Sequence, residues 1–150
     1  MRPKRNLFRK LARLDASEWR NLFAAQYAIV AAQFYVWFRK RGGLVSSVAA
    51  KPEETTPDGP VDPRVIALGK AVDRTASYGL VRAHCLVRSI ALKRLLEDKG
   101  FPGAVIRVGV RPNNGGMQAH AWVEYNGTVI GDKERHVVQF DQLSGIDLDI

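Results

Sequence analysis

The chain has 150 residues, a length typical of one compact domain. Hydrophobic residues make up 46% of it and charged residues 25%, a composition that excludes disordered and fibrous proteins. The lone cysteine, Cys85, excludes an internal disulfide framework and any zinc or iron–sulfur site built from several cysteines of one chain. The net charge is +8, which by itself suggests an anionic partner such as nucleic acid or a membrane surface.

The excess positive charge is confined to the N-terminal part of the chain. Residues 1–41 contain ten Lys or Arg and two Asp or Glu, whereas residues 42–150 contain thirteen of each. Nucleic-acid binding is disfavoured, because the basic residues form no groove-reading motif. The apolar run at 23–38 lacks the form of a secretory signal and is shorter than the ~20 residues needed to span a bilayer. We therefore expect a cytoplasmic protein and leave contact with a membrane surface open.

Residues 15–41 predict one long helix. Asp15 and Glu18 have the spacing of a capping box, and Leu14 and Trp19 that of a hydrophobic staple. One stripe of residues recurs at steps of three and four: Trp19, Leu22, Phe23, Gln26, Val30, Phe34 and Trp37. Such a face requires a cover, which is the body of the protein, a docked partner or a membrane surface.

The rest of the chain predicts two shorter helices and then strands. A proline-rich linker at 51–60 precedes a helix that begins at Asp62-Pro63, and a third helix runs over 85–99. Strands are expected at 104–110, 119–124, 128–132 and 136–140, with Asn126-Gly127 in a hairpin turn. Helices followed by antiparallel strands predict an α+β fold. We divide it into a basic N-terminal segment with the long helix and linker, 1–61, and a core, 62–150.

Three residues fall where nucleophilic catalysis would need them. Cys85 lies at the start of a helix, where the positive end of the helix dipole favours the thiolate. His120 lies near the start of one strand and Asp132 at the end of its partner. An imidazole can take the thiol proton, and a carboxylate on its other nitrogen fixes its orientation. These residues therefore predict a Cys-His-Asp site.

The hairpin between the two strands tests this prediction. A two-residue loop, Asn126-Gly127, would place His120 opposite Lys133. A three-residue loop, 125–127, would place His120 opposite Asp132, where Cβ atoms are about 4.5–5.5 Å apart. Because the His–Asp pair as drawn requires the longer loop, we expect the three-residue loop, with Gly127 in the left-handed conformation.

Two other interpretations of these residues stay open. A lone cysteine on a helix with apolar neighbours is often a small core residue, and a strand histidine is often structural. A zinc site is the rival chemistry, with candidate ligands His84, Cys85, His120 and His136. It is disfavoured because two adjacent residues of a helix point in different directions.

Two sequence blocks resemble a known family. The first is His84-Cys85-Leu86-Val87-Arg88-Ser89, and the second is Ala119-His120-Ala121-Trp122-Val123-Glu124, followed by Gly131-Asp132. Together they are similar to the transglutaminase-like cysteine peptidases of lasso-peptide biosynthesis, over roughly 62–140. The resemblance implies a papain/transglutaminase-like core with Cys85 as nucleophile, His120 as general base and acid, and Asp132 as orienter.

The same resemblance implies the reaction and its partners. The enzyme would cut the leader from a lasso precursor peptide without a metal or organic cofactor, and a separate ATP-dependent cyclase would then use the freed amine. Fused relatives carry an extra leader-recognition domain, for which the residues before the matched region leave little room. We therefore expect a separate leader-recognition protein, with the apolar face of 15–41 as one candidate docking surface. Transglutaminase-type acyl transfer by the same residues is the alternative.

Overall fold

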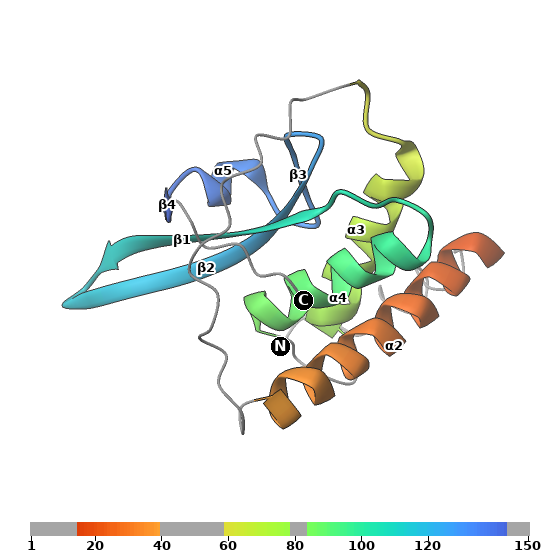
Figure 1. Ribbon diagram of the computed structural model, residues 1–150, viewed down its shortest axis with the longest axis horizontal. Coiled ribbons are helices and arrows are strands. Elements are labelled where there is room, and N and C mark those ends of the chain that lie inside the picture. Colours follow the sequence, from red (N-terminus) through yellow and green to blue (C-terminus); the bar gives the residue numbers. More distant parts are fainter. Residues whose placement is uncertain (1–14, 40–58, 79–83, 144–150) are drawn as a thin grey trace, which may run out of the picture.

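A computed structural model of the protein describes residues 15–39, 59–78 and 84–143 (Figure 1). Three helices come first and a four-stranded antiparallel sheet follows, so the predicted α+β fold is confirmed. The helices are α2 (Ala16–Arg39), α3 (Pro63–Tyr78), α4 (Cys85–Asp98) and the short α5 (Glu134–Val137). The strands are β1 (Val105–Asn113), β2 (Gly116–Tyr125), β3 (Thr128–Ile130) and β4 (Asp141–Gln142), in the sheet order β3-β2-β1-β4.

The long helices begin where their capping residues predict. The Asp15 N–H donates to the Glu18 carboxylate over 3.3 Å, and the Ser17 N–H donates to the Asp15 carboxylate over 3.3 Å, which confirms the capping box. The Arg64 N–H donates to the Asp62 carboxylate over 2.8 Å, so the second predicted cap is also confirmed. Both helix starts are thus stabilised by hydrogen bonds between residues two or three positions apart.

The layers of the fold are the sheet, then α3 and α4, and then α2 on the outside (Figure 1). One hydrophobic core joins α2, α3, α4 and one face of the sheet. α2 enters this core through the fully buried Ala25, Ile29 and Ala32. No helix in the described ranges is long and apolar enough to cross a membrane. The predicted linker lies largely outside the described residues, and the division at residue 61 stays a prediction.

The body of the protein covers only part of the predicted apolar stripe of α2, since Leu22 packs against the core. Of the predicted stripe, Trp19, Phe23, Phe34 and Trp37 are exposed, so the body of the protein does not cover them. Small and branched residues pack closely on the neighbouring helices, and the bulky rings are left on the opposite side. Leu14 of the predicted staple, and residues 40–41 at the end of the predicted helix, lie outside the described residues.

The first hairpin of the sheet is longer than its sequence predicts. We expect a loop at 111–116, but β1 runs to Asn113 and β2 starts at Gly116. Pro112 is tolerated inside β1 because β4 pairs with β1 only at Gly109 and Val110, so Pro112 faces no hydrogen-bonding partner on that side.

The second hairpin overturns the expected three-residue loop. Tyr125 pairs with Thr128, so the loop is the two residues Asn126 and Gly127, with φ angles of 49° and 71°. Both left-handed angles suit the tight turn whose twist matches that of the strands. β3 then ends at Ile130, two residues before Asp132. The cross-strand pairing of His120 with Asp132 is therefore wrong as drawn.

The strand expected at 136–140 is also wrong. The segment forms α5 and a turn, in which the His136 N–H donates to the Lys133 carbonyl over 2.8 Å and the Phe140 N–H to the Val137 carbonyl over 3.0 Å. Val137 and Phe140 are both buried and are three residues apart, which is a helical rather than a strand spacing. They pack on Trp122 in a small cluster separate from the main hydrophobic core.

Gly131 turns the chain directly after β3. Its φ is +73°, and an added Cβ would lie 2.9 Å from Leu92 Cδ2. Opposite it, a Cβ on Gly69 of α3 would lie 2.6 Å from Ile130 Cγ2 and 2.8 Å from the Gly131 nitrogen. Because these two glycines approach closely, the turn packs directly against α3. The turn also positions Asp132, the next residue.

Substitution of Gly131 by alanine is expected to destabilise the fold by more than the same change at Gly115. Both glycines have positive φ, which costs an L-residue about 1–2 kcal/mol, but a Cβ at Gly115 meets no atom within 4 Å. The overlap with Leu92 should add about 1–3 kcal/mol to the loss for Gly131→Ala. Urea unfolding of both variants checks the difference, and equal losses would contradict the close approach.

Candidate active site

His120 and Asp132 form a hydrogen-bonded pair at the edge of the sheet. His120 Nε2 and Asp132 Oδ2 are 2.7 Å apart, and an ionised carboxylate can only accept, so the ring nitrogen is the donor. β3 has ended before this point, and the turn at Gly131 brings Asp132 beside β2. The predicted pair therefore exists, although a turn and not strand register produces it. The second ring nitrogen of His120, Nδ1, makes no hydrogen bond with a described residue.

The His120 ring is buried in an aromatic cluster. It stacks on Trp122 with ring centroids 6.2 Å apart and lies 5.1 Å from the Phe140 ring. His120 and Trp122 share a sheet face because side chains two residues apart in a strand point the same way. Trp122 is itself held by its indole N–H, which donates to Glu124 over 2.9 Å. Gly109, opposite His120 in β1, leaves the space that Phe140 and Trp122 occupy.

Arg88 of α4 contacts the same carboxylate oxygen as His120. Its Nη2 donates to Asp132 Oδ2 over 2.8 Å, and its Nη1 to Asp73 of α3 over 3.2 Å. Arg88 and the Asp132 side chain are 20% and 9% exposed, so this ion pair is shielded from water far more than a surface pair. The Arg88–Asp132 ion pair thereby connects the N-terminal half of α4 to the edge of β2, because Asp132 also binds His120.

The surroundings of Asp132 favour its ionised form. Burial acts to raise the pKa of this carboxyl, but the hydrogen bonds from His120 and the Lys133 N–H, together with the charge of Arg88, lower it by more. The pKa of Asp132 therefore lies below its usual value. An ionised Asp132 is the form that can orient His120 and stabilise a positive imidazolium.

Cys85 is the first residue of α4, as predicted. It is half-buried, and it packs against the hydrophobic core. The Ser89 hydroxyl donates to the Cys85 carbonyl over 3.0 Å. No hydrogen bond joins the Cys85 thiol to His120 or to any other residue in the described ranges. The structure thus brings His120 and Asp132 together and places Cys85 one helical turn before Arg88, their neighbour on α4.

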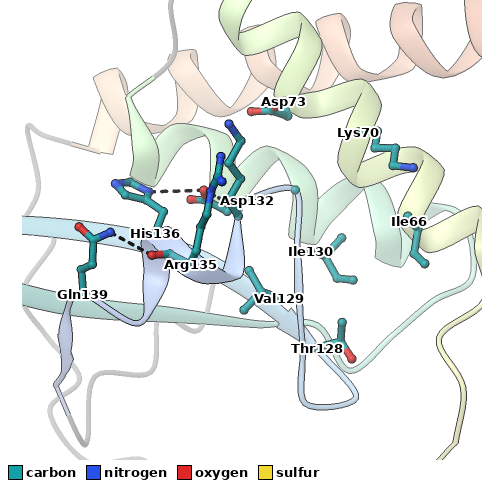
Figure 2. A pocket seen from close by; sticks show the side chains of 12 residues that line it. Ile66, Lys70, Asp73, Thr128, Val129, Ile130, Asp132, Arg135, His136 and Gln139 are labelled. Atoms are coloured by element: carbon teal, nitrogen blue, oxygen red, sulfur yellow. Dashed lines mark hydrogen bonds and ion pairs between the residues drawn. The ribbon is translucent and has the colours of Figure 1, made fainter.

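A cavity of about 620 Å³ borders Asp132, and neither Cys85 nor His120 lines it. Its walls come from α3, from β3 with the turn that follows it, and from α5 (Figure 2). Figure 2 shows His136 pointing toward Asp132, with its Nδ1 3.5 Å from Asp132 Oδ1. The cavity therefore gives water access to the rear of the carboxylate.

The side chains able to hold a metal differ from the rival zinc set. Donor atoms of His120, Asp132 and His136 lie within 4.8 Å of one another, and no other such group occurs in the described part of the chain. His84 and Cys85 do not join them. Arg88 already occupies Asp132 Oδ2, and its positive charge opposes a cation there. The geometry accordingly favours a proton-transfer pair over a metal centre.

Arg88 and His136 are absent from the predicted Cys-His-Asp site, although His136 is one of the candidate ligands of the rival zinc set. Arg88 follows Cys85 by three residues, a spacing that puts both on one side of a helix, and this spacing could have indicated it. His136 follows Asp132 by four residues, but its place depends on α5, where the sequence predicts a strand.

Comparison with known proteins assigns the chain to a family. A family model described as the Transglutaminase-like superfamily matches residues 28–145, most of the chain. The matched range includes Cys85, His120 and Asp132. No curated protein and no solved structure shows a significant match.

Asp132→Asn is expected to weaken the pH dependence of folding stability. Because the pKa of Asp132 is lowered in the folded state, its ionised form stabilises the fold above the usual Asp pKa of about 3.9, and this stabilisation is lost as the pH falls through the lowered value. The free energy of unfolding should thus rise less between about pH 2 and pH 6 in the variant. Urea titrations measure it. Asp98→Asn, at the exposed end of α4, is the control, and identical profiles for both variants would contradict the prediction.

Proposed function

The chain belongs to the transglutaminase-like superfamily, and from this premise we propose that it is a cysteine peptidase that removes the leader from a lasso-peptide precursor. The observation that carries the proposal is the 2.7 Å hydrogen bond between His120 and Asp132. An imidazole held by a carboxylate through one nitrogen acts as a general base through the other. Cys85, the only cysteine of the chain, supplies the nucleophile.

Acylation uses the free nitrogen of His120. Nδ1 takes the proton of the Cys85 thiol, and the thiolate attacks the carbonyl carbon at the leader–core junction. A C–S bond forms as the carbonyl π electrons move to oxygen, and backbone N–H groups at the start of α4, Cys85 included, are placed to stabilise the oxyanion. The C–N bond then breaks, and the leaving amine of the core peptide takes the proton from His120.

Hydrolysis of the thioester completes the cycle. His120 takes a proton from water, and the resulting hydroxide attacks the acyl carbon. The C–S bond breaks, His120 returns the proton to the Cys85 sulfur, and the leader leaves as a carboxylic acid with the Cys85 thiol regenerated. Asp132 stays ionised throughout, because Arg88 and the Lys133 N–H bind it independently of His120. Its role is to keep Nε2 protonated, so that Nδ1 is the nitrogen that exchanges protons.

The lasso-peptide substrate is proposed on the two sequence blocks around Cys85 and His120, which resemble those of lasso leader peptidases. The released core amine would be the substrate of a separate ATP-dependent cyclase. A separate leader-recognition protein is proposed on the same resemblance, because fused relatives of that family carry an extra leader-recognition domain.

Acyl transfer is the second candidate reaction, since the superfamily includes transferases as well as peptidases. The acyl-enzyme is common to both activities, and they differ only in whether water or a primary amine attacks it. Exposure of the site decides the outcome, because a shielded thioester can exclude water.

Cys85→Ala is expected to abolish cleavage of a lasso precursor peptide at its leader–core junction. Mass spectrometry of the precursor, incubated with wild type or variant and with the recognition protein, should show free leader and core for the wild type only. His84→Gln is the matched control, because His84 is exposed and its side chain makes no capping hydrogen bond. Cleavage retained in Cys85→Ala would end the proposal.

A primary amine in the same reaction should leave the products unchanged. A peptidase releases the leader as a free acid, whereas a transferase would release it with the mass of the amine added. A leader found mainly as the amine adduct would replace the peptidase proposal with acyl transfer.

Cleavage is expected to depend on the leader-recognition protein. Without it, the rate at low precursor concentration should fall by about tenfold or more, because the second protein raises the local concentration of leader at the site. Time courses with and without the partner measure this. Equal rates would show that the peptidase binds the leader unaided.

A further inference from the structure

Helix α2 presents apolar side chains on two opposite faces. Its inner face holds the fully buried Ala25, Ile29 and Ala32. Its outer face carries six large aromatic residues that are between 39% and 77% exposed: Trp19, Phe23, Tyr27, Phe34, Trp37 and Phe38. At about 100° per residue, these six positions fall within one sector of about 100°, opposite the buried residues. No other described element covers this aromatic face.

An exposed face of this kind is not an ordinary surface. The chain has 13 aromatic residues, three Trp, four Tyr and six Phe, and nearly half of them stand on this sector of one helix. Two pairs already stack on each other, Trp19 with Phe23 at 5.8 Å and Phe34 with Phe38 at 6.4 Å between ring centroids. Contiguous exposed apolar patches of this extent mark interaction sites.

The sequence on both sides of α2 is rich in positively charged residues. The sequence before it, residues 1–14, contains six Lys or Arg and no acidic residue. Arg39, Lys40 and Arg41 follow one another at its other end. The acidic residue within the helix, Glu18, forms an ion pair with Arg74 of α3 and so belongs to the inner side. The occupant of this face must therefore accept aromatic rings, and negative charge on it would complement the basic sequences that flank α2.

We propose that the aromatic face of α2 docks the protein on an anionic lipid bilayer. Trp, Tyr and Phe are the side chains that settle at the boundary between headgroups and acyl chains, and flanking Lys and Arg bind anionic headgroups. A helix of 24 residues is about 36 Å long and would lie in the plane of the surface. A protein partner would need matching carboxylates beyond both ends of a flat aromatic strip, whereas a bilayer supplies negative charge everywhere.

This docking is compatible with the active site. α2 is the outermost helical layer, and the sheet with α5 lies on the far side of α3 and α4 (Figure 1). A protein lying on α2 therefore keeps the edge of β2, with His120 and Asp132, away from the bilayer. The inference does not depend on the proposed peptidase reaction, since lipid binding is measured without substrate.

Flotation of the full chain with lipid vesicles tests the proposal. Vesicles of phosphatidylcholine alone are compared with vesicles that also contain phosphatidylglycerol, and the protein should float with the second kind. Neutralising Lys4, Arg5, Arg9 and Lys10 as glutamines should lower the partition coefficient by about fivefold per residue. Raising the ionic strength to about 1 M should weaken binding of the wild type, because it shortens the Debye length to about 3 Å.

The aromatic contribution is tested with a matched pair of variants. The combined change Phe23→Ser, Trp37→Ser and Phe38→Ser should lower binding by about tenfold or more and leave the fold intact, because all three rings are exposed. The control, Tyr78→Ser with Met117→Ser, removes equally exposed apolar side chains from α3 and β2 and should bind as the wild type does.

Tryptophan fluorescence gives an independent measurement. Trp19 and Trp37 lie on the aromatic face, whereas Trp122 is 3% exposed in the interior. Lipids with brominated acyl chains should quench the wild type, and they should leave the variant Trp19→Phe with Trp37→Phe unquenched.

Three results would overturn the proposal. The first is failure of the wild type to float with anionic vesicles, and the second is flotation that the aromatic substitutions leave unchanged. The third is a lipid-free wild type that sediments as a dimer while the aromatic variant is a monomer, which would assign the face to a second copy of the chain.

Discussion

The Asp132 carboxylate links three parts of the fold through very few atoms. One of its oxygens accepts hydrogen bonds from His120 on β2 and from Arg88 on α4, and Arg88 also reaches Asp73 on α3. Removing this carboxylate would leave a largely buried guanidinium with one partner and His120 with none on Nε2. The orientation of the proposed general base and the seating of the nucleophile helix thus depend on the same ionised group.

The arrangement also explains why Asp132 stays ionised while His120 exchanges protons. The two cationic or potentially cationic partners of Asp132 keep it ionised, and an aromatic cluster with Trp122 and Phe140 encloses the His120 ring. The ring is consequently held on one nitrogen and packed on its faces. Only Nδ1 is left for proton exchange, which is the requirement for a general base of fixed orientation.

The charge of the chain belongs to another part of the molecule. The excess of basic residues lies before α2 and at its end. Residues 42–150, which include His120 and Asp132, contain equal numbers of basic and acidic residues. The aromatic face of α2 lies between these basic ends. A layered fold with α2 outermost therefore separates a surface for association from the proposed catalytic edge, with α3 and α4 between them.

Local chemistry in the sequence was sufficient to predict the helix starts and the fold class, and it selected His120 and Asp132, which the structure brings together. Asp15 and Asp62 cap their helices through contacts with residues two or three positions away, and Cys85 opens α4 as its sequence predicts. Tertiary structure decided how His120 meets Asp132 and which side of α2 is buried. The turn at Gly131, after the end of β3, places the Asp132 carboxylate beside His120. This turn fits against α3 only because Gly69, 62 positions away in the sequence, has no side chain. Periodicity shows that α2 has an apolar face, but the close packing of helices selects Ala25, Ile29 and Ala32 for the interior and leaves the rings outside.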